Sequence, residues 1–495
     1  MEAESLPMIE VDGARIVYRR IERTSVEPPV RMLSGLAQCF PTCHARPPLT
    51  KSTMDSSERG TQFSSRSEDA SASKSGYWNL IPNGVVLLLF YLLFAALLVT
   101  RRTDCIRNPQ FWAEEGTRFF VEAREHSVWI NLAAYSYGYF DLLVRLIHQA
   151  AALVRLEYAP LVLVLSALAI QATIPTFVIS ARCANWMGIF PIRVAAALLY
   201  CGLPNSFETH CIALHARVHL AVLAALIIVS TPPLSRLGKV FDASILTLSA
   251  FSGPFVLLLA PTALWRQWHT PTSTGRRNCL ILVISFIFAI FALIGSGGQR
   301  LGIPLGASFR DGIRIVGGQF TLGFLLGEKL YAGILREHWF DAVAVAGLLG
   351  LAFIIFLVLA SGKTESRYLL FIGFGSLAIA LAAPIGAAPG MTSWRTLWSI
   401  PGNGQRYYLV PMAMLLFALL ALVGRGKTNA SCWIAATLLL ILGIAGVRND
   451  WKLPGFTDFQ FRKHIALYRA LPPGSSVTVP INPPGWHMEI RKPAQ

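Results

Sequence analysis

"PNGVVLLLFYLLFAALLVT", residues 82–100, is a run of 19 residues without a charged side chain, and it decides the class of this protein. A helix needs about 20 apolar residues to cross the hydrocarbon core of a bilayer, so this run predicts a membrane-spanning helix. Arg101 and Arg102 follow it directly, as basic residues often do where a helix leaves the membrane.

Similar apolar runs recur along most of the chain. We expect about eleven spans, at 82–100, 138–156, 159–180, 190–205, 213–230, 242–263, 278–297, 342–361, 368–387, 407–423 and 430–447. The segment 313–332 is either an extra span or a re-entrant stretch. The predicted fold is therefore all-α, a polytopic transmembrane helical bundle with a small C-terminal extramembrane α+β segment.

The composition supports this class. The 495 residues are 54% hydrophobic and only 14% charged, whereas a soluble domain carries about 25% charged residues. The formal charge of +16 is spread over short clusters between apolar runs. Such clusters orient membrane helices, which argues against nucleic acid as a partner. The eight cysteines are scattered, and the close pair Cys39 and Cys43 has no second pair to complete a four-ligand metal site.

We expect three parts along the chain. Residues 1–77 are serine-rich and lack apolar periodicity, which predicts a disordered cytoplasmic tail; translation from Met54 is the alternative. Residues 78–447 form the transmembrane domain, with a first external loop at 101–137. Residues 448–495 form a small external segment that contains a helix, a turn and a short strand.

The stretch "RNPQFWAEEGTRFF", residues 107–120, places Glu114 and Glu115 between aromatic residues beside the first span. In a helix, Phe111, Glu115 and Phe119 share a face, and the aromatic rings would lie at headgroup depth. Adjacent carboxylates repel, which can raise one pKa and suits a general base or a divalent-cation ligand. Spacing alone favours the simpler interpretation, an amphipathic surface helix whose acids are solvated.

Two arginines are candidates for binding a phosphate group, because the guanidinium fork matches phosphate geometry. Arg406 precedes Tyr407 in "GNGQRYYLVP", at the predicted external start of a span, where it either contacts phosphate or anchors the helix. Arg145 lies within 138–156, and because a charged side chain inside a membrane span is energetically unfavourable, it suggests a partner or a function. If that segment lies along the interface, Arg145 only snorkels, and the direction of the middle spans changes.

The stretch "HCIALHARVHL", residues 210–220, places His215 and His219 four residues apart. Imidazoles at this spacing share a helical face, as they do in metal sites. Because no HExxH motif accompanies them, we expect both histidines to line a substrate cavity instead.

Five short motifs, in this order, resemble the GT-C superfamily of integral-membrane glycosyltransferases and a group of uncharacterised bacterial membrane proteins near it. They are "NPQFWAEEGTRFF" (108–120), "YGYFDLLVRL" (137–146), "SGPFVLLLAP" (252–261), "GQRYYLVP" (404–411) and "VPINPPGWHMEI" (479–490). The resemblance covers the membrane portion and the tail but not the first 77 residues.

This resemblance implies a multi-pass enzyme of the bacterial inner membrane. It would transfer a sugar from a polyprenyl-phosphate-linked donor to a glycan, lipid or protein acceptor on the external face. In that superfamily an acidic residue of the first external loop acts as a base or binds a divalent cation such as Mg²⁺ or Mn²⁺. By position this residue is Glu114 or Glu115, with Asp104 as a further candidate. Relatives often have Glu-Asp where this chain has Glu-Glu.

Two other functions remain open from the sequence. A transporter or flippase of a lipid-linked sugar would also be polytopic, but we find no internal repeat, and the polar features lie at span ends. A scaffold that recruits other glycan enzymes would need no catalytic acid, and its recruiting surface would be the soluble tail.

Overall fold

The computed structural model describes residues 8–11, 14–17, 84–136, 138–296, 304–382, 390–425 and 429–494. The chain divides into two units, Met1–Gly76 and Tyr77–Gln495. The described part of the first unit is an antiparallel hairpin of β1 (Met8–Val11) and β2 (Ala14–Val17). The rest of the predicted disordered tail lies outside the described residues and stays a prediction.

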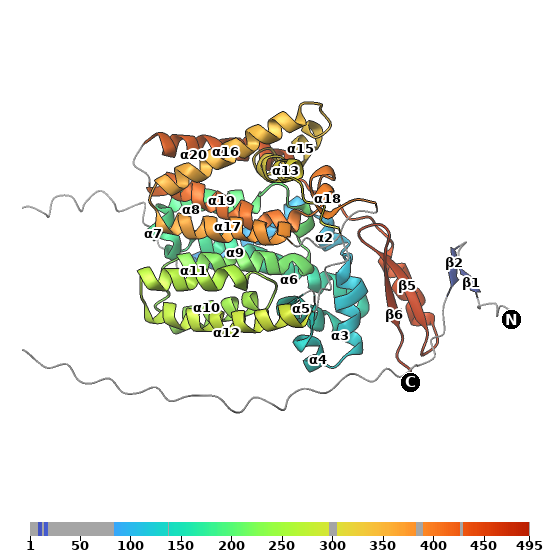
Figure 1. The fold of residues 1–495 in the computed structure, drawn as a ribbon. Helices are drawn as coiled ribbons and strands as arrows, with labels where there is room; N and C mark the ends of the chain where they lie inside the picture. Colours follow the sequence, from blue (N-terminus) through green and yellow to red (C-terminus); the bar gives the residue numbers. More distant parts are fainter. Residues whose placement is uncertain are drawn as a thin grey trace, which may run out of the picture. The chain divides into compact units, whose positions relative to one another are not determined.

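Seven helices in the described part of the chain are long and apolar enough to cross a membrane. The protein is therefore a multi-pass integral membrane protein, and Figure 1 shows two of these helices, at residues 364–382 and 405–425, lying side by side. The seven helices are α1 (Gly84–Arg101), α6 (Ala159–Ile179, preceded by η2, Leu156–Tyr158), α12 (Ser273–Gly295), α16 (Phe340–Ala360), α17 (Thr364–Ala382), α19 (Gln405–Arg425) and α20 (Ala430–Ile441, continued by η7, Leu442–Val447, and α21, Arg448–Asp450). These seven coincide with seven of the eleven expected spans.

The other four expected spans are shorter or broken, so eleven spans are not confirmed. Helix α5 (Leu142–Ala152) has 11 residues, or about 17 Å, and α9 (Ala216–Val229, preceded by η5, Ala213–His215) is also short. Helix α8 (Phe190–Cys201) is bent by 98° from the preceding helix, η3 (Ala181–Cys183) with α7 (Ala184–Met187). Counting that bent pair as one span raises the number to eight.

The expected span at 242–263 is a helical hairpin of α10 (Arg236–Ala250) and α11 (Val256–His269). At one end of the bundle, the break at 251–255 forms 2.9 Å backbone hydrogen bonds with residues 140–142. Away from that break, Asp242 in the middle of α10 pairs with Arg182 at 2.7 Å. Arg182 also donates to the carbonyl of Thr231, and Arg266 near the end of α11 donates to the neighbouring carbonyl of Ser230. The two helices therefore run in opposite directions.

Helices α9 and α19 form the centre of the bundle, because nearly all of their side chains are buried. The outer helices α1, α12 and α16 instead carry exposed large apolar side chains, which are suited to lipid. Examples are Leu88, Leu92, Phe288, Phe291, Phe353 and Phe356.

The segment between the first two long helices is folded and packs on the C-terminal tail. It contains α2 (Asp104–Arg107), the π-helix η1 (Glu115–Phe120), α3 (Val121–Glu125), α4 (Val128–Ala133), β3 (Tyr135–Ser136) and β4 (Tyr139–Phe140). The tail contains α22 (Phe461–Ala470) and the antiparallel strands β5 (Ser476–Ile481) and β6 (Trp486–Arg491), in agreement with a small α+β segment.

The sequence predicted that the aromatic rings of the first loop lie among lipid headgroups, but in the structure these side chains are buried within the protein. Phe111 is fully buried, and its ring lies 4.9 Å from that of Phe120 and 5.5 Å from that of Phe461 in the tail. A Cβ on Gly116 would approach the Ile481 side chain to 2.8 Å. The loop is therefore held by protein contacts with the tail.

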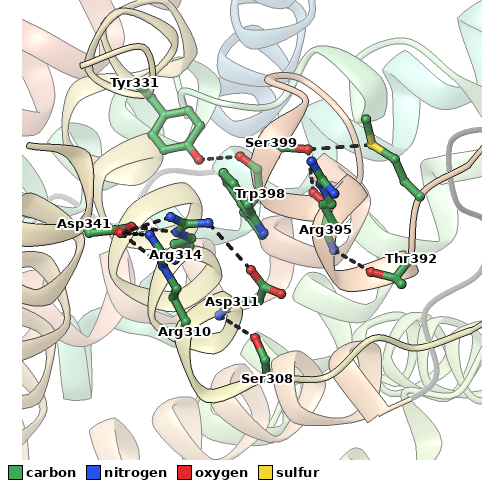
Figure 2. A network of polar contacts seen from close by, with 11 residues as sticks. Ser308, Arg310, Asp311, Arg314, Tyr331, Asp341, Thr392, Arg395, Trp398 and Ser399 are labelled. Carbon is green, nitrogen blue, oxygen red and sulfur yellow. Dashed lines mark hydrogen bonds and ion pairs between the residues drawn. The ribbon is translucent and has the colours of Figure 1, made fainter. Parts of the chain in front are cut away.

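The segment predicted as an extra span or a re-entrant stretch is a series of short helices. These are α13 (Phe309–Ile313), the π-helix η6 (Arg314–Leu322), α14 (Gly323–Leu326) and α15 (Glu328–Ile334), and α18 (Ser393–Ser399) packs beside them. Figure 2 shows how Arg310 and Arg314 both bond to Asp341 at the start of α16, each at 2.6 Å. The Arg314 guanidinium also lies 4.2 Å from the Trp398 ring centroid, so this cluster fastens the short helices together.

Candidate functional site

A cavity of about 90 Å³ lies where α9, α11, α17 and α19 meet β4. The polar part of its lining consists of Tyr139, His215, Arg217, Arg406 and Tyr407. The rest of the lining is almost entirely apolar: Val218, Pro254, Phe255, Leu258, Ile379, Ala380 and Val410, with Ser376 among them. The cavity is thus amphipathic, which suits a ligand with an anionic head and an apolar chain.

Each arginine of the cavity is oriented by its own carboxylate. Arg217 forms an ion pair with Asp141, and Arg406 forms one with Glu208. The backbone N–H of Arg406 also donates to Glu208 Oε2 at 3.2 Å. Because these carboxylates cancel most of the arginines' charge, the cavity offers directional N–H donors more than net positive charge.

Tyrosine rings flank both guanidinium groups. The Arg217 guanidinium lies 5.2 Å from the Tyr139 ring centroid, and that of Arg406 lies 4.8 Å from the Tyr407 centroid. Arg406 also donates to the Tyr407 hydroxyl at 3.5 Å. These contacts restrict the rotamers of both arginines, so their donors are held in place before a ligand arrives.

Glu114 does not line the cavity, but it lies close enough to interact with its two arginines. It is half-buried, and its carboxylate interacts electrostatically with both Arg217 and Arg406. The preceding residue, Ala113, has a φ of 42°, in the left-handed region that residues with a Cβ rarely adopt. Because of this turn, the Glu114 side chain points in a different direction from the aromatic side chains before it.

Glu115 has a different environment. It is 2% exposed; Oε1 accepts from the N–H of Leu214 at 2.8 Å, and Oε2 accepts from that of Trp112 at 3.2 Å. Burial raises the pKa of Glu115 to about 7, although these backbone donors oppose the shift. Its carboxyl group therefore clamps the loop before His215 and does not line the cavity.

Asp104, the further acidic candidate, binds the tail. Its Oδ2 accepts from the backbone N–H of Phe456 at 2.9 Å, at the start of the segment that leads to α22. It is not among the residues that line the cavity. The structure thus places Asp104 as an anchor between α2 and the tail.

Arg145 also lies away from the cavity. Its side chain is 1% exposed, and it donates to Glu122 at 2.8 Å and to Asn131 at 2.6 Å. The guanidinium lies 5.3 Å from the Phe119 ring centroid. The sequence predicted that this buried charge has a partner or a function. The partner is Glu122, within the first loop.

The two candidate histidines separate. His215 lines the cavity, whereas His219 lies in a second space of about 10 Å³. There His219 hydrogen-bonds to the Tyr200 hydroxyl at 2.7 Å and to Gln171 at 3.0 Å. They do not form one face because His215 belongs to the short 3₁₀ turn η5, and the α-helix begins only after it.

Three residues near the arginines were not among the sequence candidates. Asp141 and Tyr139 belong to "YGYFDLLVRL", and Glu208 lies in η4 (Phe207–Thr209). No spacing pattern marks Glu208, whose partner lies 198 positions further along the chain. Arg217 stands between the two histidines in "HCIALHARVHL", and its signal was a charged residue inside an apolar run.

Metal ligation was a second possibility for the acidic loop and the histidines. Within the described ranges, no three or more His, Cys, Asp and Glu side chains form a group that could hold a metal ion.

No protein-family model and no curated protein sequence matches this chain. Solved structures of the Archaeoglobus fulgidus oligosaccharyltransferase show a distant likeness. AglB, in complex with an inhibitory peptide and a dolichol-phosphate, matches with a TM-score of 0.40 and 13% identity over 78% of this chain and 58% of that chain. The apo form matches with a TM-score of 0.41 and 12% identity over the same shares.

These matches assign no family to the chain. The aligned region spans 58% of the length of the archaeal structures, and identity is too low to carry residue roles across.

Proposed function

We propose that this protein is a membrane glycosyltransferase. It transfers a sugar from a polyprenyl-phosphate-linked donor to an acceptor hydroxyl or amide at the end of the bundle that carries the first loop, which we take to be the external face of a bacterial inner membrane. The supporting observation is a cavity lined by two arginines and by apolar side chains, with Glu114 outside the lining but close enough to interact with both arginines.

The two parts of the donor, its phosphate and its isoprenoid chain, bind different residues of the cavity. Arg217 and Arg406 bind its phosphate, since the planar fork of N–H donors in a guanidinium group matches the geometry of phosphate oxygens. The isoprenoid chain lies against the apolar residues of the lining, which include Phe255 just before α11, Leu258 in α11 and Val410 in α19. These donors also stabilise the negative charge that grows on the leaving phosphate.

Glu114 acts as the general base. It removes the proton from the acceptor as the acceptor's oxygen or nitrogen forms a bond to the anomeric carbon of the sugar. The bond from that carbon to the phosphate oxygen breaks, and the lipid phosphate leaves with the electron pair. General bases at such positions contribute about 10²–10⁴-fold to the rate. No step is assigned to a metal ion.

The direct test is a transfer assay with purified protein in lipid vesicles and a radiolabelled polyprenyl-phosphate sugar. We expect Glu114→Gln to lower the transfer rate at least about 100-fold. Glu125→Gln is the matched control, since Glu125 is an exposed acid of the same loop. Normal transfer by folded Glu114→Gln protein would refute the role of this carboxylate.

A second arm separates the enzyme from a flippase of a lipid-linked sugar. Vesicles loaded with labelled donor report whether the lipid changes leaflet without transfer of its sugar. Donor movement in the absence of any transferred product, unchanged by Arg406→Lys, would favour the flippase.

A further inference from the structure

Two buried cysteine thiols interact at the end of the bundle that carries the first loop. Cys105 in α2 and Cys211 hydrogen-bond through their side chains, and both are free thiols. They are 1% and 2% exposed, respectively. Of the described cysteines, these two come from different loops at the same end of the bundle, 106 positions apart in the chain.

Two arginines at the end of α1 fix the segment that carries Cys211. Arg101 donates to the carbonyls of Cys201 and Leu203, each at 3.1 Å. Arg102 donates to the carbonyl of His210 at 3.1 Å, one residue before Cys211. Cys105 follows Arg102 by three residues, so the same contacts bring the two thiols together.

The backbone of Cys211 is itself held in an uncommon conformation. Its φ is 57°, in the left-handed region, which costs a residue with a Cβ about 1–2 kcal/mol. Such a conformation persists only when its surroundings enforce it. The position of the Cys211 side chain is therefore set by the fold and not by local preference.

We propose that Cys105 and Cys211 form a disulfide bond that ties the first loop to the segment 202–212. The proposal does not depend on the proposed glycosyl transfer. It requires only that this end of the bundle faces a compartment that oxidises thiols.

Bond formation requires a disulfide-bearing oxidant, such as a protein oxidoreductase. The Cys105 thiolate attacks one sulfur of that disulfide and releases a thiolate of the oxidant. The Cys211 sulfur, having lost its proton, then attacks Cys105 in the mixed disulfide and releases the second thiolate. Two electrons reduce the oxidant to a dithiol, and the two protons from the cysteines end on it.

The surroundings favour Cys105 as the first nucleophile. The hydrogen bond with Cys211 lowers the pKa of Cys105 and outweighs burial, and the nearby Arg102 guanidinium lowers it further. Since both thiols are nearly inaccessible in the folded protein, the exchange takes place before the first loop closes over them. Once buried, the bond is shielded from reductants.

Forming this bond would brace the candidate site. The first loop carries Glu114, and the segment 202–212 carries Glu208, which orients Arg406. A covalent link between Cys105 and Cys211 would fix the position of the first loop relative to the segment 202–212, and so that of Glu114 relative to Arg406.

The test is peptide mapping of the full-length protein, expressed in bacterial membranes with an intact disulfide-forming system. Cells are quenched in acid and alkylated with N-ethylmaleimide under denaturing conditions before any reductant is added. We expect a cross-linked peptide that contains Cys105 and Cys211 in more than half of the molecules. Cys183 and Cys201, which are equally buried, should be recovered alkylated.

A thermal measurement provides the second readout. Reductant added during unfolding should lower the melting temperature of the wild type by about 5 °C, because the bond closes a long loop. The double variant Cys105→Ser/Cys211→Ser should show no such shift. Recovery of Cys105 and Cys211 as alkylated monomers, or a cross-link of either to another cysteine, would overturn the proposal.

Discussion

Glu115 should make the stability of this protein depend on pH in a way that a single substitution removes. Burial raises the pKa of its carboxyl group to about 7, from an ordinary value of 4.5. The folded protein therefore keeps this proton up to about pH 7, whereas the unfolded chain loses it near pH 4.5. Over this interval the folded state binds more protons, so stability falls as the pH rises.

The magnitude follows from the size of the shift. One pKa unit corresponds to 1.36 kcal/mol, so the interval between the two values costs about 3 kcal/mol once the pH exceeds 7. Glu115→Gln cannot titrate. Between pH 5 and pH 8 the wild type should therefore lose about 2–3 kcal/mol relative to this variant, a change of about 3 °C in melting temperature.

The assay is thermal unfolding in detergent, followed by tryptophan fluorescence at several pH values from 5 to 8. The comparison uses the difference between wild type and Glu115→Gln, because titrations elsewhere cancel. Glu125→Gln, which removes an exposed acid of the same loop, should follow the wild type at every pH. Parallel curves for the wild type and Glu115→Gln would refute the assignment of Glu115 as a buried carboxyl that binds a proton.

Three further changes test individual contacts. Asp104→Ala should loosen the tail by removing an acceptor worth about 1.5–3 kcal/mol, and limited proteolysis near residue 456 should quicken about tenfold; unchanged cleavage would contradict the anchor. Glu122→Gln should lower the melting temperature, because it leaves Arg145 buried without its carboxylate at a cost of about 3 kcal/mol, while the donor KM stays constant. Glu208→Gln should raise the donor KM at least about tenfold in the transfer assay, since it releases Arg406; an effect on stability alone would make Glu208 merely structural.

The sequence predicted spans well where one apolar helix runs without interruption, in the buried α19 as well as in the outer α1. The run at 82–100 is such a case, because its apolar residues surround the helix and nothing interrupts it. The prediction of a single span failed at 242–263, where the hydropathy stays high although the chain reverses its direction at 251–255. The reversal depends on hydrogen bonds with residues 140–142, and such distant partners leave no periodic signal.

The sequence predicted only part of the candidate site, because contacts between residues far apart in the chain leave no local signal. Arg406 and Tyr407 stand out because a charged and a polar residue begin an apolar run, and the structure places both at the cavity. Glu208 leaves no such trace, because its role arises from a contact with Arg406 far along the chain. Arg145 was a candidate because burying a charged side chain in an apolar segment costs free energy. In the structure its charge is paired with Glu122 of the first loop and not used in the cavity.

Environment, more than sequence position, separates the two adjacent glutamates. The left-handed turn at Ala113 and the start of the π-helix at Glu115 direct the two carboxylates to different neighbours. Glu115 is surrounded by backbone N–H groups that hold a loop, and Glu114 lies near the two arginines of the cavity. A carboxylate that must accept a proton from a substrate needs access, whereas one that joins loops needs burial. In the proposed reaction Glu114 is the base, whereas Glu115 is the buried carboxyl that joins two loops. Replacing Glu114 should therefore change the transfer rate, and replacing Glu115 should change the pH dependence of stability.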